Sequence, residues 1–271
     1  MEITKSEFEK ILSVATSSQV EVFEKVQPYL ATAYEECKTD VLGDVGTQAA
    51  EDNQHELLTK AVKQWVCLKA FLSVFRQLDL VLTPTGFGVV STNQMVPASK
   101  QRVDALVGHL RDGMLIAHGQ LVGNLFCITE WGNSPQAKEN VDNLFFDFRM
   151  LQKYQGPAAS HLDWQAAQRL IGEADEMLRR KLSNEYMESL LSHVRCGSCA
   201  DADRTVISLC RQIISMWIAG DQEGVKLKMR RLLATLDANL ETYSIYAQHG
   251  YPVNHHENFQ NTQHASAFIF G

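Results

Sequence analysis

The segment 193–199 places three potential metal ligands, His193, Cys196 and Cys199, at regular intervals of three residues. Zinc is usually held by four nitrogen or sulfur ligands in a tetrahedral array, so this segment supplies three of the four. Asp201 or a histidine near the end of the chain could complete the set. Structural zinc sites usually include a second Cys-x-x-Cys pair, and the chain contains none. We therefore interpret the segment as an interhelical loop, with a metal site and a redox disulfide as the open alternatives.

Two other groups of polar residues have ordinary structural interpretations. The acidic pairs Glu35-Glu36 and Asp175-Glu176 are adjacent on expected helices, where neighbouring side chains do not face each other, so we interpret them as solvated faces. A histidine-rich polar segment near the C-terminus is of the kind that binds transition metals only adventitiously, and it contains His249, His255, His256 and His264.

The catalytic and cofactor motifs that can be recognised by their spacing are absent from the sequence. The stretch Thr85-Gly86-Phe87-Gly88 lacks the lysine and the hydroxyl residue that a phosphate-binding loop requires. There is no Gly-x-Ser-x-Gly, no His-Glu-x-x-His and no dinucleotide-binding fingerprint. The sequence therefore predicts a non-enzymatic protein with no catalytic residue, no metal and no cofactor.

The net charge of −7 argues against a protein that grips nucleic acid over a wide surface, because such binding requires clustered lysine and arginine residues. Two short basic groups occur, at 179–181 and 226–231, and we interpret both as solvated helix faces rather than tracks for phosphates. We expect no sequence-specific binding of nucleic acid. No apolar run reaches the roughly 18 residues of a membrane-spanning helix. The charged N-terminal stretch is unlike a signal peptide, so we expect a cytosolic protein without a membrane partner.

Apolar residues recur at helical spacing along most of the chain, which predicts a mainly α-helical protein. A Ser6-x-x-Glu9 capping box predicts the first short helix. Pro28 lies inside the apolar pattern of the second helix, so the helix either begins near Pro28 or is kinked there, and the cost of about 3 kcal/mol for proline inside a helix favours a start near Pro28. The helix is expected to end at Gly43, before a loop over 44–54. A helix is expected over 56–78, and because its apolar residues cover more than half of its circumference we expect it at the centre of a bundle. Further helices are expected from Ser99 as N-cap to about Trp131, from a cap at Ser160 through Tyr186, and over 224–248. The run 144–150 could form either a helix or a strand.

An offset of 141 residues aligns apolar positions in the first half of the chain with apolar positions in the second. Phe23 corresponds to Trp164 and Leu30 to Ile171, and a second pair of helices keeps the same offset. We infer a weak internal duplication with two similar helical-bundle halves. The expected domains are 1–133 and 134–271, with the boundary at the Gly-Asn-Ser-Pro sequence that ends at Pro135.

Helical spacing stops between Asp79 and Met95, where an alternating run, a Thr85-Gly86 turn and a β-branched run predict a β-hairpin insertion near 79–95. The tail 249–271 is polar at first and ends in an apolar aromatic cluster, which predicts an extended C-terminal arm. We expect this arm to dock on the hairpin or on a neighbouring subunit. The candidate partner contacts are Thr85, Phe87, Val89, Val90, Phe268, Ile269 and Phe270.

The first half of the chain resembles an uncharacterised family of prophage proteins from Bacteroidetes. The specific part of the resemblance is LTPTGFGVV at 82–90 followed by PASKQRV at 97–103, and FEKVQPYLATAYEECKTDVLG at 23–43 precedes it. The resemblance covers roughly residues 5–130, and the second half of the chain departs from it.

The resemblance implies a virion structural protein of a tailed phage or prophage. Its helical build is similar in kind to head-completion proteins, the head–tail connectors or adaptors that dock under the portal ring. On that basis we expect a homo-oligomeric ring that contacts portal and tail proteins, at the head–tail interface of the virion and in the bacterial host cytoplasm during assembly. The alternatives are a helical metal- or ligand-binding protein that uses His193, Cys196 and Cys199, and a helical regulatory or chaperone-like module of the same phage.

Overall fold

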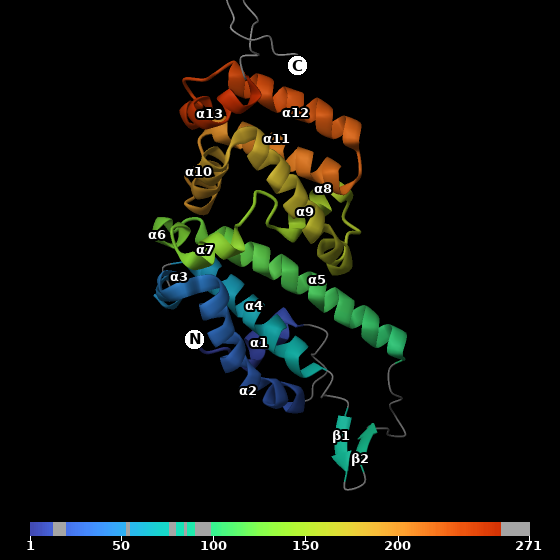
Figure 1. Ribbon diagram of the computed structural model, residues 1–271. Helices are drawn as coiled ribbons and strands as arrows, with labels where there is room; N and C mark the ends of the chain where they lie inside the picture. The colour runs from blue at the N-terminus through green and yellow to red at the C-terminus, as the bar shows by residue number, and fades with distance from the viewer. Residues whose placement is uncertain (13–19, 53–54, 76–79, 84–85, 90–98, 256–271) are drawn as a thin grey trace, which may run out of the picture. The chain divides into compact units, whose positions relative to one another are not determined.

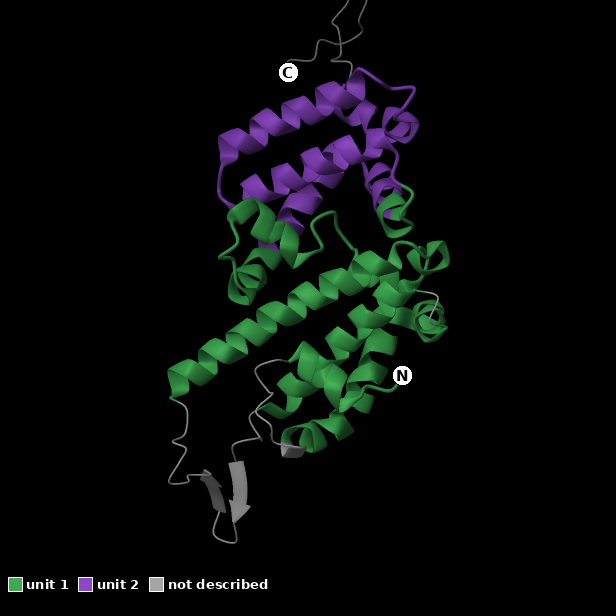
Figure 2. Ribbon diagram, turned by 180° about the vertical axis from the view of Figure 1, so that it is seen from behind, with its two compact units in different colours: residues 1–168, 192–198 green, residues 169–191, 199–271 purple. Residues whose placement is uncertain are grey.

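The computed structural model describes residues 1–12, 20–52, 55–75, 80–83, 86–89 and 99–255 (Figure 1). The described chain is mainly helical, as predicted. It divides into two compact units, coloured separately in Figure 2: residues 1–168 and 192–198 form unit 1, and residues 169–191 and 199–271 form unit 2. The boundary expected between 133 and 134 therefore falls inside unit 1. Within the described ranges, no helix combines the length and the apolar character needed to cross a membrane.

Three helices form the centre of unit 1: α2 (Val20–Cys37), α4 (Glu56–Val74) and α5 (Lys100–Leu125). Helix α4 packs against both α2 and α5, and the residues it buries lie on several of its faces: Leu58, Ala61, Val62, Trp65, Val66, Cys67, Leu68, Ala70, Phe71 and Val74. This burial confirms the prediction of a central helix from its nearly continuous apolar pattern. The predicted helix start near Pro28 is wrong, because α2 continues through Pro28. Pro28 is exposed, and packing against α4 stabilises the helix despite one missing hydrogen bond.

The first helix, α1 (Lys5–Ile11), has Thr4 rather than Ser6 as its N-cap. The Glu7 N–H donates to the Thr4 hydroxyl at 3.3 Å, and the Thr4 N–H donates to the Glu7 carboxylate at 2.9 Å. Glu7 also forms an ion pair with Lys63 of α4 at 2.6 Å, and this contact lowers the pKa of Glu7 to about 2. The pairs Thr4/Glu7 and Ser6/Glu9 have the same capping-box spacing. Glu7 also pairs with Lys63 of α4, and this contact favours the box formed by Thr4 and Glu7.

Residues 44–54 were expected to form a loop, but most of them belong to a helix. A single π-helical turn, η2 (Lys38–Leu42), follows α2 and leads directly into α3 (Gly43–Glu51). Gly43 has φ of +61°, in the left-handed region that favours glycine, so the chain can turn sharply there and start a new helix. The prediction treated Gly43 only as a helix end, and this explains the error.

Side chains from two short helices, α6 (Thr129–Gly132) and α7 (Pro135–Asn140), satisfy the backbone of this π-turn. A helix end leaves carbonyl oxygens without intrahelical partners. Three successive carbonyls of the turn each accept a side-chain N–H: Val41 from Trp131 at 2.9 Å, Asp40 from Asn140 at 2.7 Å and Thr39 from Gln136 at 3.2 Å. These contacts place α6 and α7 in unit 1, although the sequence suggested a domain boundary between them.

Two short strands lie between α4 and α5. β1 (Leu80–Thr83) pairs antiparallel with β2 (Gly86–Val89), with Leu80 opposite Val89 and Leu82 opposite Phe87. Residues 84–85 and 90–98 of the expected insertion lie outside the described residues. Helix α5 then begins after Ser99, but the Ser99 hydroxyl makes no capping hydrogen bond, contrary to the prediction.

Helix α5 ends at Leu125, short of the predicted end at Trp131. The next longer helix is α8 (Phe148–Gln155), so the undecided segment 144–150 contains a turn and a helix start, not a strand. Asp147 caps α8 by accepting the Arg149 N–H at 2.9 Å. A Cβ at Gly119 would overlap the Asp147 carboxylate, so the close approach of this cap to α5 requires glycine at that position.

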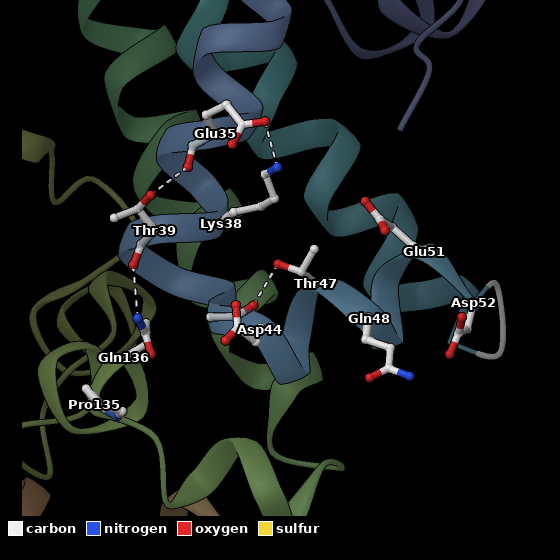
Figure 3. Close-up of a pocket in the computed structure, with 11 residues that line it drawn as sticks. Glu35, Lys38, Thr39, Asp44, Thr47, Gln48, Glu51, Asp52, Pro135 and Gln136 are labelled. Carbon is white, nitrogen blue, oxygen red and sulfur yellow. Dashed lines mark hydrogen bonds and ion pairs between the residues drawn. The ribbon is translucent and has the colours of Figure 1, made fainter.

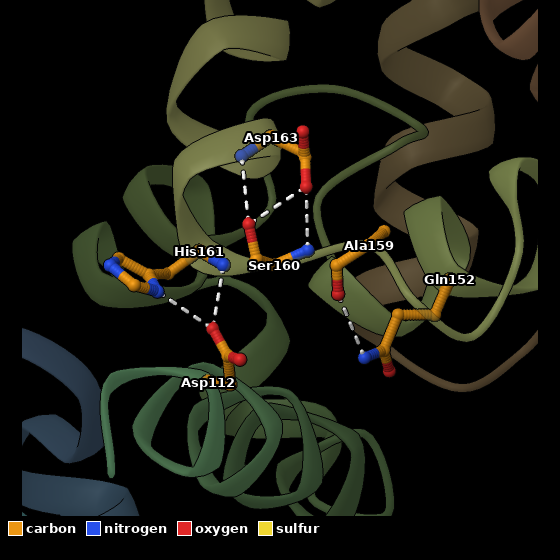
Figure 4. A network of polar contacts seen from close by, with 6 residues as sticks. All are labelled: Asp112, Gln152, Ala159, Ser160, His161 and Asp163. Carbon is orange, nitrogen blue, oxygen red and sulfur yellow. Dashed lines mark hydrogen bonds and ion pairs between the residues drawn. The ribbon is translucent and has the colours of Figure 1, made fainter. Parts of the chain in front are cut away.

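A polar network fixes the start of α9 (His161–Leu182) against α5 (Figure 4). Asp112 of α5 accepts the His161 backbone N–H at 2.6 Å, and its same oxygen lies 2.8 Å from the His161 ring nitrogen Nδ1. Ser160 donates its N–H and its hydroxyl to Asp163 at 2.8 and 2.7 Å, and the backbone N–H lowers the pKa of Asp163. Ser160 Oγ in turn accepts the Asp163 backbone N–H at 3.5 Å, so the expected cap at Ser160 is confirmed.

Unit 2 is built around α11 (Asp201–Ile218) and α12 (Gln222–Asp237), which fold back on each other through a tight turn. Gly220 in this turn has φ of +74°. Helix α9 and helix α10 (Asn184–Arg195) contribute residues to both units. The helix predicted over 224–248 is wrong, because α12 ends at Asp237 and the chain continues as α13 (Ser244–His249) and α14 (Tyr251–Asn254).

Candidate functional site

The seven predicted partner contacts are mostly outside the part of the chain that the structure describes. Five of them cannot be placed: Thr85, Val90, Phe268, Ile269 and Phe270. Phe87 and Val89 belong to β2. β2 pairs antiparallel with β1, so that Val89 lies opposite Leu80 and Phe87 lies opposite Leu82 along the backbone.

In the described part of the chain, β1 and β2 pair only with each other, so each strand has a free edge there. A two-stranded ribbon alone is at best marginally stable in water, and a free edge is a template for another strand. The arrangement is therefore suited to contact with a further surface or strand.

The last described residues are anchored on unit 2, which corrects the predicted start of the C-terminal arm. Tyr246 donates its hydroxyl to Asp237 at 2.9 Å, and His255 Nε2 lies 3.0 Å from the other carboxylate oxygen of Asp237. Asn254 donates to the carbonyl of Lys181 at 2.7 Å. Residues 251–254 form a helical turn, so an extended arm cannot begin at 249 as predicted. The arm, if extended, is confined to 256–271, which lies outside the described residues.

The residues 193–198 close the end of α10 in a Schellman motif. The Ser198 N–H donates to the His193 carbonyl at 2.9 Å, and the Gly197 N–H donates to the Val194 carbonyl at 3.1 Å. Gly197 has φ of +62°, as this motif requires. The segment is thus the end of a helix, and Gly197 is the residue that this end requires.

The metal alternative gains no support from the described residues. Among them, no group of three or more His, Cys, Asp or Glu side chains is arranged to hold a metal ion. All six cysteines, which the described ranges include, are free. The Cys196 thiol lies 3.8 Å from the Thr129 carbonyl, and burial raises the pKa of the Cys199 thiol.

A polar groove of about 680 Å³ runs along η2 and α3 in unit 1 (Figure 3). Several of its side chains bind each other or nearby backbone: Glu35 pairs with Lys38 at 2.6 Å, and Thr47 donates to the Gly43 carbonyl at 2.6 Å. Glu51, also on the groove, accepts the Tyr34 hydroxyl at 2.8 Å. The groove combines carboxylates with a lysine, and it presents no grouping that would hold a metal ion.

The acidic pairs behave differently from each other. Glu35 and Glu36 form surface ion pairs with lysines, as expected for a solvated face. Asp175 is buried and forms an ion pair with Arg179 at 2.6 Å, so the solvated-face interpretation is wrong for this residue. Burial of Asp175 is offset by that pair, because an unpaired buried carboxylate is costly.

The sequence interpretation missed a groove between α11 and α12 of unit 2, lined by Arg204 on one helix and Arg231 on the other. The basic residues of α12 were interpreted as a solvated face. Their position beside the hydroxyl residues of α11 depends on how the two helices pair, and no local sequence pattern sets that pairing.

Comparison with known proteins gives a family of unknown function. Residues 9–141 match the model of DUF6712, a family of unknown function, and this range runs from α1 to the residue after α7. No curated protein matches the chain, and no solved structure matches it.

Proposed function

We propose that this protein is a non-enzymatic structural protein of a tailed-phage or prophage virion, a head–tail connector or adaptor that completes the head by assembling as a ring at the portal. Its partners would be other copies of the chain and the portal and tail proteins. It would act at the head–tail interface of the virion, and in the bacterial host cytoplasm during assembly. The resemblance of 82–103 to prophage proteins motivates the proposal.

The strand pair is the observation that carries the proposal. It lies between two long helices of unit 1 in the chain, and it has free edges among the described residues. Heterologous contacts that close into a ring require a surface on one copy that fits a different surface on the next. A ribbon on a helical frame supplies one such surface, and the C-terminal segment 256–271 is our candidate for the other.

A duplicated helical frame is supported by the burial pattern. Every residue from Phe23 to Leu42 has the same degree of burial, whether buried, half-buried or exposed, as the residue 141 positions later in the range 164–183. Both segments then pass a residue with positive φ, Gly43 in one and Ser183 in the other, and enter a new helix. We infer that α2–α7 and α9–α14 descend from one module, with the strand pair inserted in the first copy only.

A shared tertiary contact supports the same inference. Asn140, the last residue of α7, donates to the Asp40 carbonyl, and Asn254, the last residue of α14, donates to the Lys181 carbonyl. Asp40 and Lys181 are again 141 positions apart. The match to the family of unknown function ends at Val141, where the first module ends. Two related modules would give a ring subunit a rigid body.

The same substitution at a predicted contact residue and at a neighbouring strand residue provides a matched test. Val89→Thr changes a predicted partner contact in β2, whereas Val81→Thr changes a residue of β1 that is not a predicted contact. Threonine keeps the β-branched shape, so both variants should fold. We expect Val89→Thr to raise the concentration needed for assembly by about tenfold and Val81→Thr by less than about twofold, as measured by sedimentation velocity. Equal effects of the two substitutions would contradict a role for Val89 as a partner contact.

A further inference from the structure

The groove between α11 and α12 combines basic and hydroxyl side chains in a small open space. Its volume is about 370 Å³. Its lining contains no carboxylate and only one apolar residue: Arg204, Thr205, Ser208, Leu209, Gln212, Arg231 and Thr235. In a chain with a net charge of −7, this composition marks a local concentration of hydrogen-bond donors.

The two arginines are available to a ligand. The Arg231 side chain is exposed and makes no ion pair with another described residue. Arg204 pairs with Asp201 at 3.3 Å, but their side chains are 69% and 98% exposed, so water competes strongly for this contact. A guanidinium group presents its N–H donors as a planar fork that matches two oxygens of one phosphate.

Neutral donors lie in the same groove. Ser208 Oγ accepts from Gln212 Nε2 at 3.3 Å, which leaves the Ser208 hydroxyl hydrogen and the second N–H of Gln212 for a ligand. The hydroxyls of Thr205 and Thr235 donate to backbone carbonyls of their own helices. They line the groove, but they can only accept a hydrogen bond from a ligand. The two guanidinium groups and the two neutral donors, Ser208 and Gln212, together suit an anion that has several oxygen atoms.

The positive charge continues beyond the groove along α12. Lys228 lies one turn before Arg231 on the same side of the helix, and Arg230 is exposed beside it. Lys226 is less available, because it pairs with Glu223 at 2.8 Å. An open groove with charge extending past it suits a chain of phosphates better than one enclosed phosphate, and it lacks the apolar pocket that a peptide side chain would need.

We propose that the α11–α12 groove binds the phosphodiester backbone of nucleic acid without reading its sequence. The groove is formed entirely within unit 2, so the proposal is independent of ring assembly and can fail while the connector function holds. Each phosphate contact releases counterions, so binding should weaken steeply with salt.

The test measures fluorescence anisotropy of the full chain with a labelled duplex of about 20 base pairs, between about 50 and 200 mM salt. Arg204→Gln with Arg231→Gln should weaken binding at least about tenfold and reduce the slope of log K against log salt by about 2, as expected for two lost phosphate contacts. Arg102→Gln with Arg111→Gln is the matched control. Both of these arginines are exposed on α5, and the change in net charge is the same. The control should change the affinity less than about twofold.

Three results would overturn the proposal. One is absence of binding by the unaltered chain at the lowest salt, and another is an equal loss in the groove variant and the control, which would indicate a general charge effect. The third is tighter binding of inorganic phosphate or pyrophosphate, measured by calorimetry, than of the duplex. Arg204→Lys with Arg231→Lys keeps the positive charge but removes the paired N–H donors of the guanidinium groups. Its affinity should therefore lie between that of the unaltered chain and that of the glutamine variant. Thermal unfolding followed by circular dichroism verifies that each variant is folded.

Discussion

Replacing Gly197 with alanine should lower the free energy of unfolding by about 2–4 kcal/mol. The cost has two causes. The left-handed conformation at φ of +62° is unfavourable for alanine, and a Cβ at this position would overlap the Phe126 carbonyl oxygen. The Schellman motif at the end of α10 could relieve this overlap only if the backbone at Phe126 or at Gly197 moved. Urea unfolding followed by far-ultraviolet circular dichroism measures the change.

Two controls connect this prediction to the interpretation of the Cys196–Cys199 segment. Gly123→Ala is the same substitution in the last turn of α5, where a Cβ would meet nothing within 4 Å, and it should be neutral or stabilise the protein by up to about 1 kcal/mol. Cys196→Ser with Cys199→Ser should cost less than Gly197→Ala. If the cysteine variant were the more damaging one, and if it released stoichiometric zinc, the segment would be a metal site and not a helix end.

Replacing Trp131 with alanine should cost about 3–5 kcal/mol of unfolding free energy, the range for removing a large buried aromatic side chain. The Trp131 side chain is fully buried, and its ring packs against Phe126 with centroids 6.2 Å apart. Its Nε1–H is the partner of the Val41 carbonyl in the π-turn. The substitution therefore opens a cavity and leaves a buried carbonyl unpaired, and denaturant unfolding measures the sum.

Conversion of tryptophan to phenylalanine separates the two contributions. Trp131→Phe keeps most of the packing but removes the donor to Val41, and we expect a cost of about 2 kcal/mol. Trp65→Phe is the matched change in α4, where the buried Nε1 has no hydrogen-bond partner among the described residues, so its cost should be smaller. Equal costs at the two positions would contradict the role of the Trp131 hydrogen bond in holding the π-turn.

The parts of the fold that the sequence predicted are those set by one helix's own pattern. The sequence predicted that α4 is central because its apolar residues lie on several faces of the helix, and a helix in the centre of a bundle is buried on several faces. The errors occurred where a distant contact decides the local structure. The side chains that hold the π-turn come from residues about 90 to 100 positions later in the chain, so the turn that connects α2 directly to α3 could not be recognised from the local sequence.

The candidate site was less accessible to sequence reasoning than the fold. The Cys196–Cys199 spacing suggested a metal because ligand spacing is visible in sequence, while the positive φ of Gly197, which marks the segment as a helix end, is not. Conversely, Arg204 and Arg231 belong to different helices, and their shared groove follows from the pairing of α11 with α12. The predicted contact residues of the arm remain predictions.

The native mass of the full chain, compared with that of a chain ending at His255, tests ring assembly most directly. Because Tyr246, Asn254 and His255 complete unit 2, removal of 256–271 should leave a folded protein, unlike a truncation at 251, which would remove α14. We predict one closed ring of defined subunit number for the full chain, and a folded monomer for the chain ending at His255. A monomeric full chain, or a truncated chain that forms rings of the same size, would contradict the account.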